Sequence, residues 1–321
     1  MTPTIQFLKE QFPDAEIDAF VRSGCEEVLW GNPGVHEVFS TGHSAKKQIS
    51  RPAHRMLLKR YDYAFDLSDS GRAKLWIVLA ASRVRGINDA YQSVGWKRCL
   101  FNRISHFEWG KQHQVLRDFH TVAEIMGLQG EPGRLRFYPQ TGSGGRPGNL
   151  PVFGDYAVIH PASRWTFKEW LPERWAAIAD SLHREHGLNV VFSCGPGTRE
   201  QNLVQAILSA CAEEHFNTNG QLSLHELGRL LQSAKVFLGI DTVAMHLAAA
   251  MQTPTVALFG PSSEWSWRPW QCRHELVLGP CNCKATRKFI CEKSKAYPCM
   301  EAITVEMVQE GIAQLLRASA K

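Results

Sequence analysis

Short apolar runs alternate with amphipathic stretches along the whole chain, and the alternation is clearest in the second half. Strands are predicted at residues 15–21, 35–39, 61–67, 83–87, 156–160, 188–193, 236–240 and 255–259. Helices are predicted at residues 5–12, 73–81, 112–126, 172–186, 198–211, 224–232, 242–251 and 304–316. Ser223 is a suitable N-cap for the helix that begins at residue 224. Strands that alternate with helices predict βα units on parallel sheets, which is the α/β class.

Residues 127–153 break this pattern with a high density of glycine, proline and serine. Such a composition supports neither a helix nor a strand, so we predict a linker at residues 141–153. The linker would separate two Rossmann-like domains, residues 1–140 and 154–321, and two domains of ordinary size suit a chain of 321 residues. Ligands of such sheets bind beyond the carboxyl ends of strands, so the site is expected in a cleft between the domains.

The composition is typical of a folded globular protein, with 44% hydrophobic and 21% charged residues. No window approaches the ~18–20 apolar residues of a membrane span, so no membrane-spanning helix is expected. The first residues lack the basic and apolar regions of a secretory signal. We therefore expect a cytoplasmic protein whose nine cysteines are reduced.

The formal net charge of +5 is mild, but the basic residues are clustered. One run without any acidic residue contains Lys46, Lys47, Arg51, Arg55, Lys59 and Arg60. A second basic run covers residues 281–295. Two solvated surfaces would explain these runs, and so would attraction of phosphorylated ligands or of an anionic membrane face.

Residues 239–246 (Gly-Ile-Asp-Thr-Val-Ala-Met-His) follow an apolar strand and open a short helix. Asp241 or Thr242 could cap that helix, and the backbone N–H groups of its first turn, with the helix dipole, suit a phosphate. His246 lies four residues after Thr242, on the face above that turn. An ordinary capped helix with a structural histidine explains the same residues, so both interpretations stay open.

The segment 160–170 leaves the carboxyl end of another predicted strand and is expected at the same edge. Lys168 could neutralise a diphosphate there, although a surface lysine is the alternative. Further hydrogen-bond donors in the segment are Ser163, Arg164 and Thr166.

A third strand ends before Gly260 and Pro261, so three strand ends are expected to converge. The small and aromatic residues of the segment 259–270 could hold a nucleoside. Its tryptophans could equally be packing residues.

Two other groups could carry chemistry. Cys281, Cys283, Cys291 and Cys299 could ligate zinc, but their spacing matches no strong zinc pattern. Near a strand end in the first domain, Asp62, Asp66 and Asp69 could face the cleft. The chain has neither a dinucleotide-binding glycine motif after a strand, nor a Walker loop, nor a nucleophile elbow, which disfavours a dehydrogenase, an ATPase and a hydrolase.

The three strand-end segments, in this order and spacing, resemble glycosyltransferase family 9, the ADP-heptose:lipopolysaccharide heptosyltransferases. Met245-His246 and the late Cys299-Met300 followed by Ile303 are most similar to the heptosyltransferase III branch. Three segments of the first half resemble the amino-terminal domain of that family. They are Phe12-Pro13-Asp14-Ala15-Glu16-Ile17, Gly31-Asn32-Pro33 and residues 61–67. The likeness covers nearly the whole chain.

The resemblance implies a GT-B fold, with two Rossmann-like domains facing across a cleft and the donor ADP-heptose bound mainly by the second. Lys168 matches the phosphate-binding lysine of the family, and His246 matches its motif histidine. The diphosphate-cradling turn corresponds to Asp241, Thr242 and Val243, where many members have glycine at the third position. The implied donor-binding residues are Ser163, Thr166, Lys168, Asp241, Thr242, Val243, His246, Gly260 and Pro261.

One departure concerns the family's first strand and its Gly-Asp loop, whose aspartate is the presumed catalytic base. This chain opens at Met1-Thr2-Pro3, which resembles the helix after that loop. A start codon assigned too far downstream, a truncation or a degenerate homologue that binds without catalysing would explain this. A sheet that lacks its central strand has exposed strand edges, so we expect the chain as written to be unstable or poorly active. The remaining candidates for the base are Asp66 and Asp69.

The implied reaction is inverting, metal-independent transfer of heptose to the lipopolysaccharide inner core, with no cofactor. Lys46, Lys47, Arg51 and Arg55 would meet the phosphorylated acceptor. The protein would then sit peripherally on the cytoplasmic face of the inner membrane, and no nucleic-acid partner is expected. A transferase of another nucleotide sugar and a binder without turnover are the alternatives.

Overall fold

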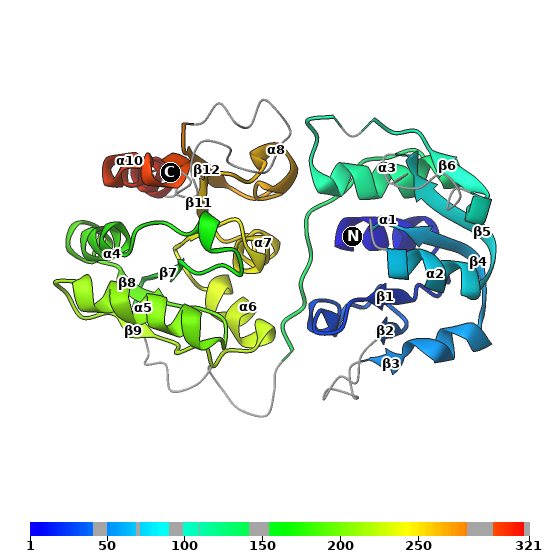
Figure 1. The fold of residues 1–321 in the computed structure, drawn as a ribbon, viewed down its shortest axis with the longest axis horizontal. Coiled ribbons are helices and arrows are strands. Elements are labelled where there is room, and N and C mark those ends of the chain that lie inside the picture. Colours follow the sequence, from blue (N-terminus) through cyan, green and yellow to red (C-terminus); the bar gives the residue numbers. More distant parts are fainter. Residues whose placement is uncertain are drawn as a thin grey trace. The chain divides into compact units, whose positions relative to one another are not determined.

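The computed structural model describes residues 1–40, 50–68, 71–89, 99–108, 110–140, 154–280 and 298–317. The chain divides into two compact units, which we call the N-terminal unit (Met1–Tyr138) and the C-terminal unit (Pro139–Lys321) (Figure 1). The predicted linker at 141–153 lies outside the described residues. Among the described helices, none is long and apolar enough to cross a membrane.

The C-terminal unit is built on a parallel sheet with the strand order β12-β11-β10-β7-β8-β9. Its strands are β7 (Tyr156–His160), β8 (Asn189–Phe192), β9 (Phe216–Asn217), β10 (Val236–Ile240), β11 (Thr255–Phe259) and β12 (His274–Leu278). Every residue of β10 and of β11 is buried, as expected for central strands covered on both faces. This complete burial explains why their continuous apolar runs predict both strands with the correct bounds.

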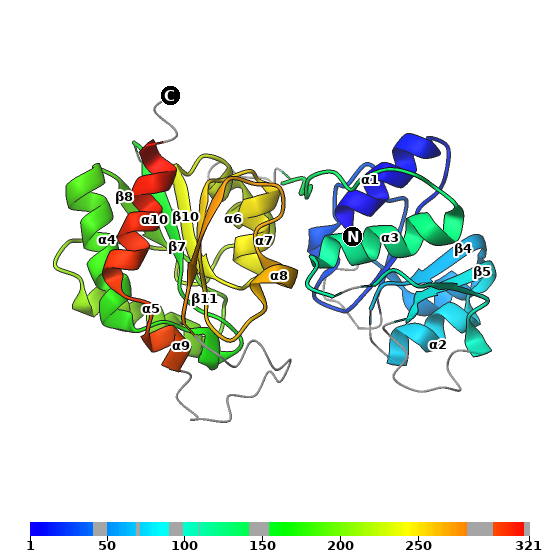
Figure 2. The ribbon, with the colours of Figure 1, turned by 90° about the horizontal axis from the view of Figure 1, so that it is seen from above.

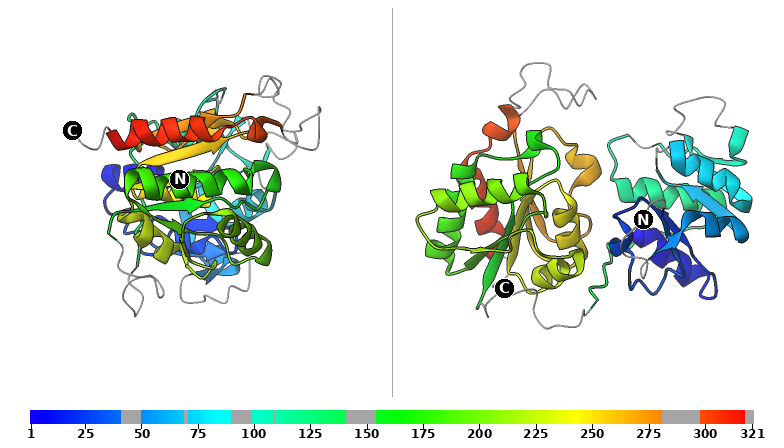
Figure 3. Two further views of the ribbon diagram at one scale, coloured as in Figure 1. Left: turned by 90° about the vertical axis from the view of Figure 1, so that its left-hand side faces the viewer. Right: turned by 60° about the horizontal axis from the view of Figure 1, so that its bottom comes forward.

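Helices cover both faces of this sheet. They are α4 (Pro172–His186), α5 (Thr198–Ala210), α6 (Leu224–Gln232), α7 (Val243–Ala250), α8 (Glu264–Trp267), α9 (Pro298–Glu301) and α10 (Val305–Arg317). Figure 2 shows α4 and α10 on one face and α6 and α7 on the other. The left view of Figure 3 shows α4 and α10 side by side. The unit is therefore doubly wound, as predicted for a Rossmann-like domain.

Local sequence signals set the ends of these helices. Pro172 stands in the first turn of α4, and Gly187 ends the helix with a left-handed φ of 65°. Ser223 and Glu226 form a capping box at the start of α6, which confirms the predicted N-cap.

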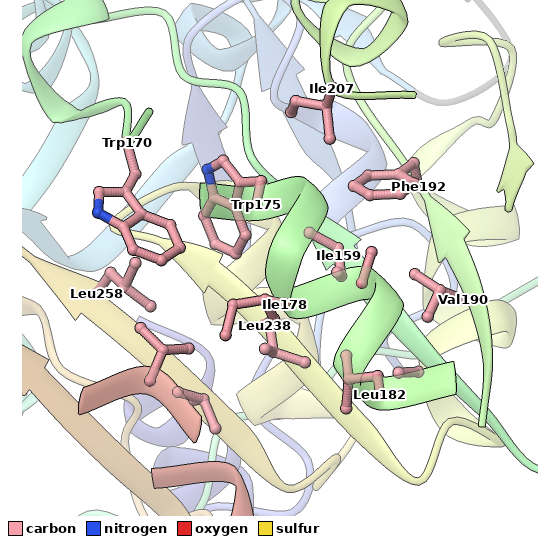
Figure 4. Packing of buried hydrophobic residues seen from close by; sticks show 14 of the residues in the cluster. Ile159, Trp170, Trp175, Ile178, Leu182, Val190, Phe192, Ile207, Leu238 and Leu258 are labelled. Carbon is pink, nitrogen blue, oxygen red and sulfur yellow. The ribbon is translucent and has the colours of Figure 1, made fainter. Parts of the chain in front are cut away.

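One large apolar cluster fills the space between the sheet and the layer of α4, α5 and α10 (Figure 4). Trp170 and Trp175 pack edge to face in it, with ring centroids 5.1 Å apart. The indole N–H of Trp170 donates to the Ile303 carbonyl, 3.0 Å away, which ties the segment before α4 to the start of α10. The core therefore fixes the loop that carries Lys168, because Trp170 lies two residues after it.

In the residues that the structure describes, the N-terminal unit has two parallel sheets instead of one. The first is β1 (Ala19–Val21), β2 (Val38–Ser40) and β3 (Arg51–Pro52), and the second is β4 (Arg60–Asp66), β5 (Ala81–Asn88) and β6 (Arg103–Ser105). The helices are α1 (Thr2–Gln11), α2 (Gly71–Leu79) and α3 (Gln114–Met126), with 3₁₀ turns at Glu26–Val28 and Ala53–Leu58. In Figure 2, α3 and α2 lie on opposite sides of β4 and β5.

β1 and β4 each pair with one neighbour in the part that the structure describes, so each has an edge. Asp18 joins the amino ends of these two strands, since its Oδ2 accepts from Lys59 Nζ at 2.7 Å and from the Tyr61 hydroxyl at 2.9 Å. Burial alone would raise the pKa of Asp18, but the hydrogen bonds from Lys59, Tyr61 and His36 outweigh it and lower the pKa. Among the described residues of this unit, the Asp18 side chain therefore connects the two sheets, which share no strand pairing there.

Candidate functional site

The three segments predicted to converge do meet at one edge of the C-terminal sheet. β11, β10 and β7 are consecutive strands, with Gly239 paired to His160 and Ile240 paired to Leu258. Because these strands are parallel, the segments that follow them leave the sheet side by side at its carboxyl edge. This confirms the predicted convergence.

Lys168 and Asp241 form the centre of this edge. Lys168 ends the 3₁₀ turn Thr166–Lys168, and Asp241 follows β10 directly. The Lys168 ammonium lies 2.6 Å from Asp241 Oδ2 and 3.4 Å from the Asp241 carbonyl oxygen. The two side chains are 18% and 9% exposed, so the ion pair is largely shielded but accessible. An ammonium held in this way is positioned at the N-terminus of α7 and has a further proton to donate.

His246 approaches the same carboxylate from one turn into α7. Its Nε2 lies 3.7 Å from Asp241 Oδ1, and its ring stands edge-on to Trp267 of α8, with centroids 6.0 Å apart. Burial by itself would raise the pKa of Asp241, but His246, Lys168 and Ser262 together bring the pKa down to about 2. Asp241 is therefore ionised at any working pH and holds the Lys168 ammonium in place.

The start of α7 differs from the sequence prediction that Asp241 or Thr242 caps it with a side chain. Thr242 occupies the N-cap position, but no side chain accepts a hydrogen bond there. The Asp241 carboxylate is instead turned toward Lys168 and His246. The first-turn N–H groups thus keep the capacity to bind an anion. Val243, in that turn, is 54% exposed, so the turn is open to solvent.

Ser163 and Thr166 shape the loop between β7 and α4. The Ser163 backbone N–H donates to Glu169 Oε1 at 2.9 Å, and its hydroxyl accepts from the Trp165 N–H at 3.1 Å. Arg199 of α5 pairs with Glu169 at 2.8 Å, which anchors the loop to the neighbouring helix. The exposed Thr166 begins the 3₁₀ turn that presents Lys168. Ser163 therefore positions the loop, while Thr166 keeps an accessible hydroxyl.

Gly260 and Pro261 form the third loop, and Gly260 has a packing reason to be glycine. A Cβ at this position would overlap the Met300 side chain of α9. Close approach of α9 thus constrains the backbone after β11. Ser262 follows in the same loop and helps to lower the pKa of Asp241, although its hydroxyl forms no direct hydrogen bond among the described residues. Ser262 is the neighbour that sequence reasoning missed, because only the folded loop brings it near Asp241.

The remaining candidates include residues of the N-terminal unit. Asp66 is buried at the end of β4, where Oδ1 accepts from the backbone N–H and the hydroxyl of Ser68, both at 2.9 Å. Arg51 and Arg55 are exposed, and Arg51 lies 3.6 Å from Glu37. Asp69, Lys46 and Lys47 lie outside the described residues, as do Cys281, Cys283 and Cys291. Cys299 is buried in α9.

Acid should weaken the C-terminal unit through Asp241. The pKa of this carboxyl group is about 2 in the folded protein and 3.8 ordinarily, so its charge stabilises the fold above pH ~4. That contribution, about 2 kcal/mol, is lost as the pH falls through about 2. Between pH ~5 and ~2, the free energy of unfolding of Asp241→Asn should therefore decrease by about 2 kcal/mol less than that of the wild type. Urea unfolding of both proteins measures this, and identical pH profiles would contradict it.

Two solved structures with the same fold are a heptosyltransferase and a family 9 glycosyl transferase. The Escherichia coli ADP-heptose lipopolysaccharide heptosyltransferase II superposes with a TM-score of 0.77 and 21% identity, over 100% of this chain and 95% of that one. A glycosyl transferase family 9 protein of Veillonella parvula gives a TM-score of 0.78 and 17% identity, over 99% and 92%. The predicted α/β GT-B fold of two Rossmann-like domains is thus confirmed.

Residues 49–297, more than half of the chain, match the model of glycosyltransferase family 9 (heptosyltransferase). The chain belongs to this family and is a glycosyltransferase, which confirms the resemblance noted in the sequence. Lipopolysaccharide heptosyltransferase 3 of Escherichia coli is 28% identical over 282 residues, which cover 84% of this chain and 82% of that protein. The heptosyltransferase 3 of strain K12 is 26% identical over 289 residues, or 84% and 80%.

Proposed function

We propose that this protein transfers heptose from ADP-L-glycero-D-manno-heptose to the inner core of lipopolysaccharide, with inversion at the anomeric carbon. The observation that carries the proposal is the Lys168–Asp241 pair beside the open first turn of α7, in a chain of family 9. Its relatives are named lipopolysaccharide heptosyltransferase 3. A similar solved structure, 20% identical, is a heptosyltransferase with ADP-2-deoxy-2-fluoro heptose.

The donor half of the reaction follows from the charges at the strand ends. An acceptor hydroxyl attacks the anomeric carbon, the bond from that carbon to the diphosphate oxygen breaks, and ADP leaves with the bonding electrons. Lys168 and the first-turn N–H groups of α7 stabilise the negative charge that develops on the diphosphate. Asp241 keeps the Lys168 ammonium aimed at this position, and His246 and Ser262 keep Asp241 ionised. Thr166, Gly260 and Pro261 line the donor from the two adjacent loops.

The acceptor half belongs to the N-terminal unit. Lys46, Lys47, Arg51 and Arg55 attract the phosphorylated core sugars, and they place the protein peripherally on the cytoplasmic face of the inner membrane. A carboxylate takes the proton from the attacking hydroxyl, and the candidates for this base are Asp66 and Asp69.

The test is acceptor-dependent release of ADP. Purified protein, ADP-heptose and lipopolysaccharide with a truncated inner core should release ADP and add one heptose mass to the acceptor. A panel of ADP- and UDP-sugars should show turnover with ADP-heptose alone. Turnover with a different nucleotide sugar instead of ADP-heptose would show that the proposed donor is wrong. Tight ADP-heptose binding without any ADP release would identify a binding protein instead.

A further inference from the structure

The carboxyl edge of the second sheet in the N-terminal unit gathers polar side chains. β5 ends at Asn88 and β6 ends at Ser105, and these two residues are partners in the register. The residues that follow them directly are Asp89 and His106. Because the two strands are parallel, both side chains start from the same edge, which is where ligands of parallel sheets bind.

Asp89 and His106 form an accessible pair at this edge. His106 Nδ1 lies 3.3 Å from Asp89 Oδ2, and the two side chains are 63% and 42% exposed. When the Nδ1–H group donates to this carboxylate, the lone pair of the ring is on Nε2. Nε2 has no hydrogen-bond partner among the described residues. The ring therefore presents a base to solvent, and a carboxylate is in place to stabilise the imidazolium that protonation forms.

The backbone of His106 is held from two sides. Its N–H group donates to Glu124 Oε1 at 3.1 Å, and the Ser105 hydroxyl donates to Oε2 of the same carboxylate at 2.6 Å. Glu124 belongs to α3, which packs against β6 (Figure 1). From the neighbouring strand, the Asn88 side-chain amide donates to the Phe107 carbonyl at 3.3 Å. Asn88 and Ser105 are fully buried, so they fix the point from which the exposed ring projects, as a reactive group requires.

Asp66, a candidate for the base at the same edge, is much less accessible. It pairs with Ile87 in the register, so the end of β4 adjoins the end of β5. Asp66 is only 1% exposed, and its Oδ1 already accepts the N–H and the hydroxyl of Ser68. A hydroxyl has to come within about 2.6–3.2 Å of the base that takes its proton. Nε2 of His106 can be reached in this way, whereas the Asp66 carboxylate would first have to be uncovered.

We propose that His106 is the general base of the transfer reaction and that Asp89 is its positioning residue. The inference rests on the proposed function, whose acceptor half belongs to this unit. Nε2 takes the proton of the acceptor hydroxyl while the hydroxyl oxygen forms the bond to the anomeric carbon. The bond from that carbon to the diphosphate breaks, and ADP leaves with the electron pair. Asp89 stabilises the imidazolium, which then gives its proton to water.

The experiment measures acceptor-dependent ADP release by the full chain, with and without added imidazole. His106→Ala should lower kcat at least about a hundredfold, because a positioned base contributes that much. Added imidazole should restore part of this rate, since the missing ring leaves a space that solvent reaches. Imidazole should not restore the rate of Lys168→Ala, which lacks a different group. Asp89→Asn should lower kcat by up to about fivefold, as expected for an exposed ion pair.

His36→Ala is the matched control for the loss of an exposed histidine. His36 is 44% exposed, and its Nδ1 lies 3.1 Å from Asp18 Oδ1, but the two residues precede β2 and β1 and so belong to the amino edge of the other sheet. The kcat of His36→Ala should equal that of the wild type. Circular dichroism checks that each variant is folded. If His106→Ala does not fold, His106→Gln is measured in its place with the same criteria.

The outcomes separate this inference from the proposed function. A loss of kcat that imidazole partly restores supports the role of His106. Equal kcat in His106→Ala and His36→Ala overturns that role, and so does a loss that imidazole leaves unchanged, since the residue would then be structural. Absence of turnover in the wild type would overturn the transfer reaction together with the inference. Wild-type turnover that persists without His106 overturns the inference alone.

Discussion

Replacing Lys168 by alanine is expected to weaken the binding of ADP and of the sugar donor by about 1–3 kcal/mol, or roughly fivefold to 150-fold. The ammonium is fixed 2.6 Å from Asp241 and beside the first turn of α7, where a diphosphate would receive its charge-assisted hydrogen bonds. The transfer rate should fall at least as far, because the same charge stabilises the leaving group. Calorimetry with ADP and steady-state ADP release measure the two effects.

The variant has a side effect that must be separated from ligand binding. Without Lys168, the Asp241 carboxylate, 9% exposed, loses its closest positive charge. Together with Asp241→Asn and the double variant, Lys168→Ala forms a double-mutant cycle, which measures the interaction energy between Lys168 and Asp241. If Asp241 only positions the lysine, Asp241→Asn should retain more ADP affinity than Lys168→Ala. Lys235→Ala is the matched control, because Lys235 forms an exposed ion pair with Asp155, 3.3 Å away, in the same unit. If Lys168→Ala binds ADP as tightly as Lys235→Ala does, Lys168 is not part of the donor site.

The sequence predicts the central strands of the C-terminal unit well because burial on both faces leaves a continuous apolar run. Residues 156–160, 236–240 and 255–259 are such runs, and the structure has the same bounds. The short strands Arg51–Pro52, Arg103–Ser105 and Phe216–Asn217 are missed, because their few side chains show neither an apolar run nor a clear alternation. His274–Leu278 is also missed, since only Val277 of this edge strand is buried.

Site chemistry is predicted less completely than the elements that carry it. The sequence places Lys168, Asp241 and His246 at one edge, because the ends of parallel strands meet there. It does not predict that Asp241 binds Lys168, since the two are 73 residues apart and only the strand order makes them neighbours. The prediction that the Asp241 side chain caps α7 is wrong for the same reason: a local pattern favours the nearest N–H groups, whereas the fold supplies the half-buried ammonium of Lys168. Gly260 is explained only by Met300, which the chain brings back from 40 residues away.

Heating is expected to unfold the N-terminal unit before the C-terminal unit, with midpoints separated by about 5 °C or more. About 1 kcal/mol of stability shifts the midpoint of a domain of this size by roughly 2–8 °C. The apolar clusters described in the N-terminal unit are small and separate, such as Ile77, Ile87 and Phe101. The cluster around Trp175 and Ile178 is one continuous core. Scanning calorimetry should therefore show two transitions, and ADP should raise only the second.

The edges of β1 and β4 are the physical reason for this order. In β4, Asp62 and Tyr63 are exposed, whereas every residue of β10 is buried. A parallel strand with unpaired backbone groups along one side gains little from burial and is open to water. Two core variants show which transition belongs to which unit. Phe119→Ala should reduce the free energy of unfolding of the N-terminal unit and lower the first midpoint, and Ile178→Ala should do the same for the C-terminal unit and the second midpoint. Each loss should be about 2–5 kcal/mol. One cooperative transition that both variants lower equally would show that the two sheets of the N-terminal unit are as firmly held as the single sheet of the C-terminal unit.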